Sequence, residues 1–483
     1  MERVMLRPQV LFFICTLLLI MTAFCMSEPD SSLSLMEATE KTTLYSAIQG
    51  FVGSWWNGSE LFPDPCGWTP IQGVSCDLFD GLWYVTGINF GEIQENSLRC
   101  TPNAEFKSHL FELKHLKTLS FINCFMFPQQ HSISIPNDNW YKLAGSLESI
   151  EFRANSGLTG EIPPSFGSLT KLQSLVFLEN KLSGELPLTL GNLVSLKRIV
   201  LAGNQFTGHI PASLGGLSEL LIFDSSRNFL TGSIPSSFGG LTSLLKLDLS
   251  NNLLDGSIPS EFGKLKNLTL LDIRNNKLSG GLPKSLQEMM SLEQMALSKN
   301  PIGGDLMSIE WQYLQNLVSL DLCFMELTGN IPESITVLSR LRFLGLTHNN
   351  LTGKLPPKLA ALPSLTALYM NGNNLTGKLE FSEWFYGKMG RRFGAGNNPN
   401  LCYPLELMST GHVPFGVKPC QQEVTLLQEG SSKNKLSYEN SEDQEYSFSV
   451  SLGYANLYYG FKGPWWGFFV SEMVIVLVLN RAL

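Results

Sequence analysis

Leucines recur along most of this chain with a period of 24 or 25 residues. The surrounding pattern reads L-x-x-L-x-L-x-x-N-x-L-x-G-x-I-P, and Leu244, Leu247, Leu249, Asn252 and Pro259 fill it. The first leucine of each unit falls at positions 147, 172, 196, 220, 244, 268, 292, 317, 341 and 365. Ten units in register predict one repeat architecture rather than several separate globular domains.

The short L-x-L core of each unit predicts a strand, because side chains alternate across a strand and the two leucines then share one face. Successive strands are expected to stack in parallel about 4.8 Å apart. No unit buries its leucines alone, so the stacked units share one core. A degenerate unit at Leu116, Leu119 and Phe121 precedes an insertion that includes residues 132–139, which brings the total to about 11 units.

An asparagine occupies the same slot in nine of the ten units: Asn155, Asn180, Asn204, Asn228, Asn252, Asn276, Asn300, Asn349 and Asn373. A stacked amide both donates and accepts, so this ladder is predicted to satisfy the turning backbone. Met325 is the exception, and its turn is predicted to be less well satisfied. The G-x-I-P half carries proline, which predicts an irregular or 3-10 convex side, distorted at 305–307 where proline is missing before Trp311.

The G-x-I-P form resembles the plant extracellular class of leucine-rich repeats. That resemblance implies a right-handed superhelix with a parallel concave sheet and a ligand-binding inner surface. The expected fold class is therefore an α/β repeat solenoid.

Nine cysteines occur, and seven remain beyond residue 26. The segments around Trp55, Trp56 and Trp68 and around 394–402 resemble the family's N- and C-terminal caps. The resemblance implies disulfides Cys66–Cys76 and Cys402–Cys420. Cys100 and Cys124 either pair across the first unit, or Cys124 fills the asparagine slot as a buried thiol. Cys323 is expected to face the inner surface, either as a reactive or intermolecular thiol or as a tolerated substitution.

The two ends of the chain differ from the repeats. Residues 1–26 have a charged start and an apolar run, which predicts a cleaved signal peptide. We expect an N-terminal cap at 27–112, repeats at 113–391, a C-terminal cap at 392–420 and an acidic juxtamembrane spacer at 421–461. The apolar segment 462–480, with a G-x-x-x-G at Gly463 and Gly467, is a transmembrane helix, a glycolipid-anchor signal, or part of a secreted end, before the tail 481–483.

No catalytic motif stands out. The sequence contains no H-E-x-x-H, G-x-S-x-G, C-x-x-C or P-loop, and its histidines are scattered. We therefore expect a protein that is not an enzyme and holds no cofactor or metal. The formal charge of −8 argues against nucleic acid as a partner. With a three-residue tail after the apolar segment, no cytosolic kinase is expected.

Binding is expected on outward positions of the strands. Asp224, Asp248 and Asp272 recur at successive strands with Arg227 and Arg274 nearby, which indicates either a polar ligand strip or the common L-D-L form of the repeat. Aromatic side chains gather near the C-terminal end, where we predict a ligand or partner surface, because exposed aromatics mark interfaces. This second group consists of Phe324, Phe343, His348 and Tyr369.

Four N-x-[ST] sequons predict glycosylation: Asn57, Asn267, Asn350 and Asn374. The last two also arise from the repeated N-N-L-T-G sequence, so they are the less specific pair.

The mature chain as a whole resembles plant leucine-rich-repeat receptor-like proteins without a kinase. That resemblance implies a plasma-membrane protein that binds an extracellular peptide, protein or glycan and acts through a co-receptor kinase, in responses to a beneficial root fungus, in defence or in growth. The alternative is a secreted inhibitor of microbial cell-wall-degrading enzymes, similar to polygalacturonase-inhibiting proteins, located in the apoplast.

Overall fold

The computed structural model describes residues 36–91, 98–126 and 132–421 of the 483-residue chain. These residues belong to one compact unit that ends at Gln421. The predicted signal peptide, the acidic spacer beyond Gln421 and the apolar segment after it lie outside the described residues. Within the described ranges, no helix is long and apolar enough to cross a membrane.

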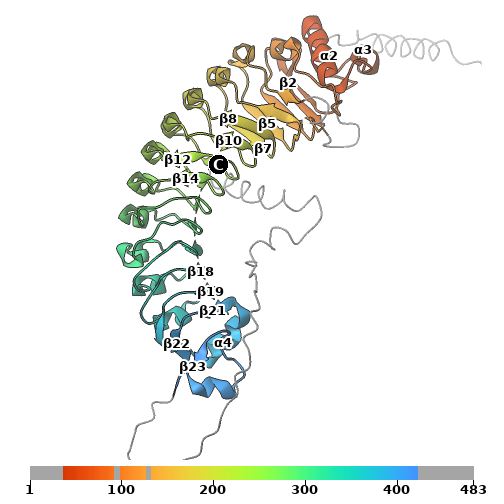
Figure 1. Ribbon diagram of the computed structural model, residues 1–483. Coiled ribbons are helices and arrows are strands. Elements are labelled where there is room, and N and C mark those ends of the chain that lie inside the picture. The colour runs from red at the N-terminus through yellow and green to blue at the C-terminus, as the bar shows by residue number, and fades with distance from the viewer. Residues whose placement is uncertain (1–35, 92–97, 127–131, 422–483) are drawn as a thin grey trace, which may run out of the picture. The chain divides into compact units, whose positions relative to one another are not determined.

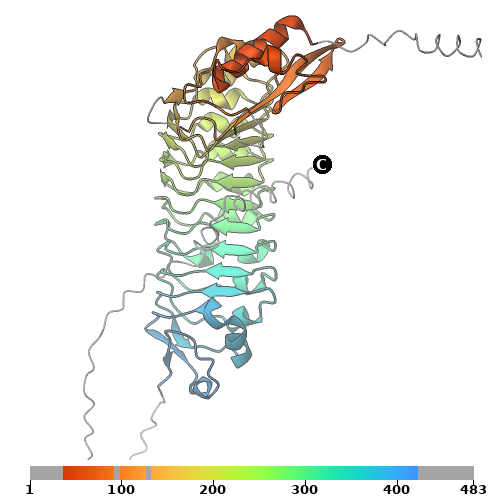
Figure 2. The same ribbon diagram turned by 90° about the vertical axis from the view of Figure 1, so that its right-hand side faces the viewer.

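The repeats form one sheet of 14 strands, and the predicted repeat solenoid is confirmed (Figures 1 and 2). All neighbouring strands are parallel except the first two, which form an antiparallel hairpin. The strands, in spatial order, are β1 (Val74–Phe79), β2 (Leu82–Gly91), β3 (Thr118–Ile122), β5 (Ser149–Arg153), β7 (Ser174–Leu178), β9 (Arg198–Val200), β11 (Ile222–Asp224), β13 (Lys246–Asp248), β15 (Leu270–Asp272), β16 (Gln294–Ala296), β17 (Ser319–Asp321), β18 (Phe343–Gly345), β19 (Ala367–Tyr369) and β21 (Phe393–Gly394).

The opposite side of each coil is a short 3-10 turn that follows the repeat proline, as the sequence predicts (Figure 1). The phenylalanine or leucine of each turn is buried beneath it; Phe166, Phe238 and Phe262 have no exposed surface. The unit without proline is distorted, because two shorter turns, Leu306–Ser308 and Trp311–Tyr313, replace one. The regular turns are Pro164–Ser168, Leu188–Asn192, Ala212–Gly216, Ser236–Gly240, Ser260–Lys264, Lys284–Glu288, Glu333–Val337 and Pro357–Ala361.

Small parallel sheets cover one flank of the coils, just after the asparagine slot. They contain β4 (Ile133–Ser134), β6 (Leu158–Gly160), β8 (Lys181–Glu185) and β10 (Gln205–Thr207) in one group, β12 (Thr231–Ser233) with β14 (Leu253–Asp255) in a second, and β20 (Thr376–Lys378), β22 (Asn400–Tyr403) and β23 (Lys418–Pro419) in a third. These bonds pair backbone groups that the main sheet does not reach.

The asparagine ladder satisfies backbone groups of two coils at once. The Oδ1 atom of Asn252 accepts a hydrogen bond from the Leu230 N–H at 3.1 Å. Its Nδ2 atom donates to the carbonyls of Ser225 and Leu249 at 3.0 and 3.1 Å. Because buried backbone groups need partners, this one side chain closes the turn of each coil. The ladder continues into the C-terminal cap, where Asn398 bonds in the same way.

The prediction that the Met325 turn is poorly satisfied is wrong for its backbone. In the regular coils, the ladder asparagine accepts a hydrogen bond from a backbone N–H of the preceding coil. At position 325 the corresponding donor is the Ile302 N–H, which instead donates to the Asn300 carbonyl at 2.8 Å. The Gly303 N–H in turn donates to the Met325 carbonyl at 2.7 Å. Gly303 has a positive φ of 67°, a conformation that costs glycine little, so the chain reroutes its hydrogen bonds here.

The N-terminal cap closes the first coils with an aromatic core. Helix α2 (Ala38–Val52) is followed by the short helix α3 (Gly58–Leu61). Phe51 at the end of α2 is fully buried, and its ring lies 4.5 Å from Phe90 and 4.8 Å from Phe121. Glu40 of the same helix is also buried, and burial raises its pKa to about 7.

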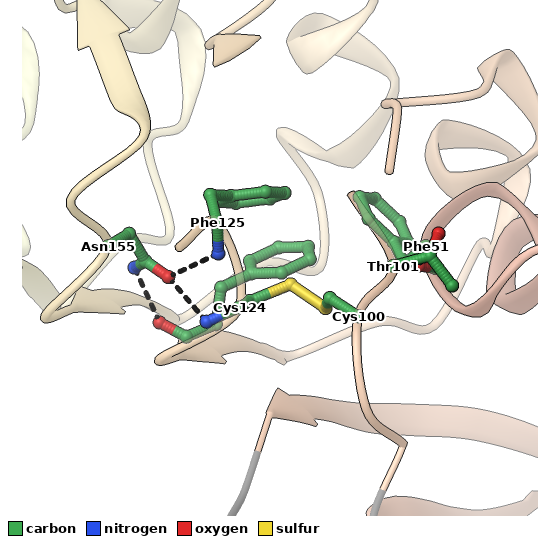
Figure 3. Close-up of a disulfide and its surroundings, with 7 residues drawn as sticks. Phe51, Cys100, Thr101, Cys124, Phe125 and Asn155 are labelled. Carbon is green, nitrogen blue, oxygen red and sulfur yellow. Dashed lines mark hydrogen bonds between the residues drawn. A yellow bond between two sulfur atoms is a disulfide. The ribbon is translucent and has the colours of Figure 1, made fainter. Parts of the chain in front are cut away.

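Three disulfides link the cysteines at the two ends. Cys66 pairs with Cys76 in the N-terminal cap, and Cys402 pairs with Cys420 in the C-terminal cap beside helix α4 (Glu383–Met389). Of the two alternatives for Cys100 and Cys124, the structure contains the disulfide (Figure 3). The Asn155 Oδ1 atom accepts hydrogen bonds from the N–H groups of Cys124 and Phe125 at 2.8 and 3.1 Å, so the ladder and the disulfide meet there (Figure 3).

Candidate functional site

The concave face of the main sheet presents side chains in columns. Because side chains alternate along a strand, every second residue points away from the leucine core. Strands β11, β13 and β15 are in register, so Asp224, Asp248 and Asp272 are neighbours in one column, as the sequence predicts. The column continues through Ala296 and Asp321.

The aspartates are tied to their own strand ends. Asp224 Oδ1 accepts from the backbone N–H and the hydroxyl of Ser226 at 3.1 and 2.7 Å. Asp248 accepts from both groups of Ser250 at 3.1 and 2.8 Å. Asp272 accepts from the Arg274 N–H at 3.2 Å. The repeated bond shows that the L-D-L form stabilises the turn after each strand.

Basic side chains offset the charge of the column. Lys246 Nζ lies 2.9 Å from Asp224 and 3.6 Å from Asp248, and Arg274 lies 2.9 Å from Asp272. Burial and the Asp248 carboxylate still raise the pKa of Asp272 to about 7. Burial and Asp224 likewise raise the pKa of Asp248. The column is therefore a largely buried, internally paired network rather than an open acidic strip.

Arg227 belongs to a different column from Arg274. It reaches across Gly203 to Glu179, and the ion pair has an N–O distance of 3.1 Å. A Cβ on Gly203 would lie 3.5 Å from the Arg227 guanidinium and 3.1 Å from Glu179. The missing side chain at this glycine leaves room for an ion pair that spans two coil steps, which the sequence alone did not indicate.

The residue before each ladder position adopts a left-handed backbone, a feature the sequence analysis missed. The same conformation recurs from coil to coil, so it belongs to the closure of the coil and not to one strained site. Its signal in the sequence is the frequent Asn or Gly at this position, since both tolerate positive φ. The non-glycine members are Asn123, Ala154, Glu179, Arg227, Asn251, Asn275, Lys299, Phe324, His348 and Asn397, with φ between 51° and 58°.

The four predicted aromatic residues lie on the concave face as two pairs, not as one cluster. Phe324 and His348 follow one another in the left-handed column, and their rings stack with centroids 4.5 Å apart. Phe343 and Tyr369 lie nearer the strand centres, with ring centroids 6.1 Å apart. Phe324 is 39% exposed and His348 is exposed, while Phe343 and Tyr369 are half-buried.

Cys323 lies on the inner side of the sheet next to Asp321, as expected, but it is covered there rather than exposed. Its side chain is buried, and its sulfur occupies the space beside Gly345. A Cβ atom on Gly345 would lie only 2.9 Å from that sulfur. Burial, reinforced by Asp321, raises the pKa of the Cys323 thiol far above its usual range. A thiolate is the reactive form, so the reactive-thiol alternative loses its basis.

The structure also shows an apolar patch on the concave face that the sequence analysis did not single out. Val176, Val200 and Ala202 are buried against one another outside the leucine core, with Leu178 and Ile222 packed against them. The signal was available, because valine stands at 176 and 200 where later strands carry aspartate. The patch precedes the aspartate column along the sheet.

The four sequon asparagines, Asn57, Asn267, Asn350 and Asn374, have exposed side chains, so glycosylation stays a prediction that is compatible with the fold. Asn350 and Asn374 lie two residues beyond His348 and Gly372, and the Asn374 N–H donates to the Leu351 carbonyl at 2.8 Å. They therefore occupy equivalent positions in successive coils, the first of which carries His348. Within the described ranges, no three His, Cys, Asp or Glu residues group closely enough to hold a metal ion.

Residues 164–388 match the model of a leucine-rich repeat region. The chain carries a leucine-rich-repeat solenoid. Piriformospora indica-insensitive protein 2 of Arabidopsis thaliana is 56% identical over 151 residues, which are 31% of this chain and 35% of that protein. Receptor like protein 29 of Arabidopsis thaliana is 34% identical over 191 residues, 38% of each chain. The resemblance to plant leucine-rich-repeat receptor-like proteins is confirmed.

A solved structure supports the same assignment of the leucine-rich-repeat solenoid. The Arabidopsis receptor kinase HAESA, crystallised in complex with the peptide hormone IDA and the co-receptor SERK1, is 32% identical with a TM-score of 0.52. The match covers 71% of this chain and 59% of that chain. The segments shared with the two curated relatives span little more than a third of those proteins' lengths.

Proposed function

We propose that this leucine-rich-repeat chain is a plant cell-surface receptor-like protein that binds an extracellular ligand on its concave sheet. The observation that carries the proposal is the composition of that face. Its outward side chains include an apolar patch at Val176 and Val200 and aromatic pairs at Phe324–His348 and Phe343–Tyr369. None of these is needed to bury the leucine core, and exposed aromatic residues concentrate binding energy at interfaces.

We further propose that the signal passes to a separate receptor kinase acting as a co-receptor. The support is the HAESA structure, whose ectodomain is similar in fold and was crystallised with a peptide hormone and a co-receptor. Disulfides in both caps fit an oxidising, extracellular location. A plasma-membrane location, glycosylation at the four sequons, and a role in defence, growth or symbiosis with a root fungus belong to the same proposal.

The experiment compares full-length tagged protein with a variant that carries Phe324→Ala, Phe343→Ala and Tyr369→Ala. Both are expressed in plant roots, and the material is separated into a membrane pellet and wall fluid. The wild type should appear in the pellet and co-purify with receptor kinases identified by mass spectrometry. The amount of kinase recovered with the triple variant should be at least about tenfold lower than with the wild type. Leu188→Ala, which removes a 70% exposed leucine from a convex turn, is the matched control.

Two outcomes contradict the proposal. Equal kinase recovery by the wild type and the triple variant would show that the aromatic pairs are not required for association with the kinase. Recovery of the wild type in wall fluid together with a microbial cell-wall-degrading enzyme would instead support the apoplastic inhibitor. Unfolding temperatures of the variants, measured in parallel, separate loss of binding from loss of fold.

A further inference from the structure

The C-terminal part of the concave sheet has glycines placed beside its aromatic rings. In the central column, Gly345, Tyr369 and Gly394 are in register on β18, β19 and β21. A Cβ on Gly394 would lie 3.1 Å from the Tyr369 ring, and a Cβ on Gly345 would lie 3.1 Å from the Phe343 ring. The two rings therefore rest against glycine backbone, where any side chain would crowd them.

The same arrangement recurs at the edge of the sheet. A Cβ on Gly372 would lie 2.8 Å from Nδ1 of His348, so this imidazole also lies against a glycine. Phe324 stacks on the other side of it, at 4.5 Å between centroids with an angle of 23°. Three aromatic rings beside three glycines make this part of the sheet an aromatic surface.

One polar group in this region has unused hydrogen-bonding capacity. The Oδ1 atom of Asn371 is buried and accepts no hydrogen bond from the described residues. It lies in close contact with Gly394, as the Tyr369 ring does, and Asn371 and Tyr369 belong to the same coil. A buried acceptor without a donor costs free energy, and a ligand hydroxyl that donates to this amide would recover it.

Two charged side chains beside this surface already have hydrogen-bond partners. Asp321 accepts from the Ser298 hydroxyl at 2.8 Å and from the Cys323 N–H at 3.2 Å. The Arg392 guanidinium donates to the Lys388 carbonyl at 2.9 Å. The unpartnered amide oxygen of Asn371 is an acceptor, so it suits a hydroxyl donor and disfavours an anionic ligand.

We infer that the surface formed by Phe324, His348, Phe343, Tyr369 and Asn371 binds a short, uncharged oligosaccharide. A sugar ring offers an apolar C–H face to an aromatic ring and hydroxyl donors to an amide oxygen, which are the two features present. An extended peptide needs donors and acceptors in alternation, and Asn371 supplies one free acceptor. From Phe324 to Tyr369 the sheet advances two coils, roughly 10 Å, the length of a short oligomer.

This inference rests on the proposed function, because it takes the concave sheet as the ligand face and names the class of ligand. The test of this inference measures ligand binding and does not depend on kinase recovery. Full-length protein is purified in detergent and treated with glycosidase, so that glycans at Asn350 and Asn374 cannot occupy the surface. The probes are linear β-linked glucose oligomers of three and six units, and galacturonic-acid oligomers provide the charged comparison. Saturation-transfer NMR and calorimetry report binding.

The wild type is expected to bind the glucose oligomers and to bind the galacturonic-acid oligomers at least about tenfold more weakly. Tyr369→Ala and Phe324→Ala should each weaken binding about tenfold. Tyr369→Phe keeps the ring and should stay within about threefold of wild type, while Leu188→Ala should match it. Phe324→Ala, at an exposed position, keeps the test valid if Tyr369→Ala fails to fold.

Absence of saturation transfer to any neutral oligomer, or equal transfer to the alanine variants, overturns the inference. So does an exclusive preference for peptides, seen as hydrogen-exchange protection of residues 319–372 by a peptide and by no sugar. In either case, kinase recovery that still depends on the three aromatic residues leaves the proposed function standing. Sugar binding without kinase recovery supports the inference and contradicts the proposed function.

Discussion

The amide oxygen of Asn349 accepts hydrogen bonds from the backbone N–H groups of Met325 and Leu327, at 3.0 and 3.1 Å. Met325 is where the ladder lacks its own asparagine, so Asn349 holds this turn from the following coil. Its Nδ2 atom also donates to the Leu322 and Leu346 carbonyls, both at 2.9 Å. One side chain thus connects the coil that carries Met325 to the coil that follows it.

Replacing Asn349 should cost far more than replacing Met325. Asn349→Leu leaves backbone groups of two coils without partners and is expected to destabilise the protein by about 2–4 kcal/mol. Met325→Leu nearly conserves volume at a fully buried position and should cost less than about 1.5 kcal/mol. Urea unfolding followed by circular dichroism measures both. Equal midpoints for the two variants would contradict the role given to Asn349.

Ser225 occupies an inward position that the repeat normally fills with leucine, between Leu201 and Leu249. Its side chain is fully buried, and its hydroxyl has no hydrogen-bond partner among the described residues. Ser225→Ala removes this unsatisfied group and is expected to stabilise the protein by about 1 kcal/mol.

The neighbouring Ser226 is the matched control. Its hydroxyl donates to Asp224 at 2.7 Å, so Ser226→Ala should destabilise the protein by about 1 kcal/mol. The two alanine variants should shift the thermal midpoint in opposite directions. Shifts of the same sign would show that the Ser225 hydroxyl is satisfied in solution.

The leucine period was sufficient to predict which residues face the core, because a strand has two faces and the recurring leucines mark one of them. It was also sufficient to place Asp224, Asp248 and Asp272 in one column, since register follows from equal spacing. The period does not say how far a side chain projects. Cys323 was expected at the surface and is buried, because neighbouring Gly345 leaves space for its sulfur to lie along the sheet.

The candidate site depended on contacts between coils, and these were less predictable. The sequence brought Phe324, Phe343, His348 and Tyr369 to one face, but their division into two pairs depends on which column each occupies. The left-handed residue of each coil sets those columns, and no hydrophobic pattern reports it. Burial of Glu40 likewise depends on how α2 meets the first strands, outside the repeat.

The Cys100–Cys124 disulfide is expected to hold the N-terminal cap on the first coils. It closes a segment of 24 residues, and such a loop predicts a stabilisation of about 3 kcal/mol through restriction of the unfolded chain. Converting both cysteines to serine should increase hydrogen exchange in α2, because the Thr101 N–H next to the disulfide donates to the Phe51 carbonyl at 2.8 Å.

The equivalent double variant of Cys402 and Cys420 serves as the control for this cap. It should increase exchange near α4 and leave α2 unchanged, since contacts in a repeat protein are local. Exchange that rises equally at both ends in either variant would mean that the disulfides act on the whole solenoid. Mass spectrometry of peptides from residues 38–52 and 383–389 provides the readout.

Glu40 makes the stability of the N-terminal cap depend on pH. Its carboxylate is buried and accepts a hydrogen bond from the Val85 N–H at 3.4 Å, and burial raises its pKa to about 7, with Glu37 adding to the effect and Lys114 opposing it. In the unfolded chain the pKa is near 4.5. Between these values the folded cap binds the proton more tightly, so its stability is greatest below about pH 4.5 and falls until about pH 7.

The expected loss over that interval is at most about 3 kcal/mol. Glu40→Gln removes the ionisable proton while keeping a polar side chain of the same length. It should flatten the dependence of α2 hydrogen exchange on pH and make the cap more stable than wild type at pH 7.5. Asp272→Asn is the comparison, because the pKa of Asp272 is raised by burial in the central coils and not in the cap. An unchanged pH slope in Glu40→Gln, with a changed slope in Asp272→Asn, would assign the effect to the aspartate column.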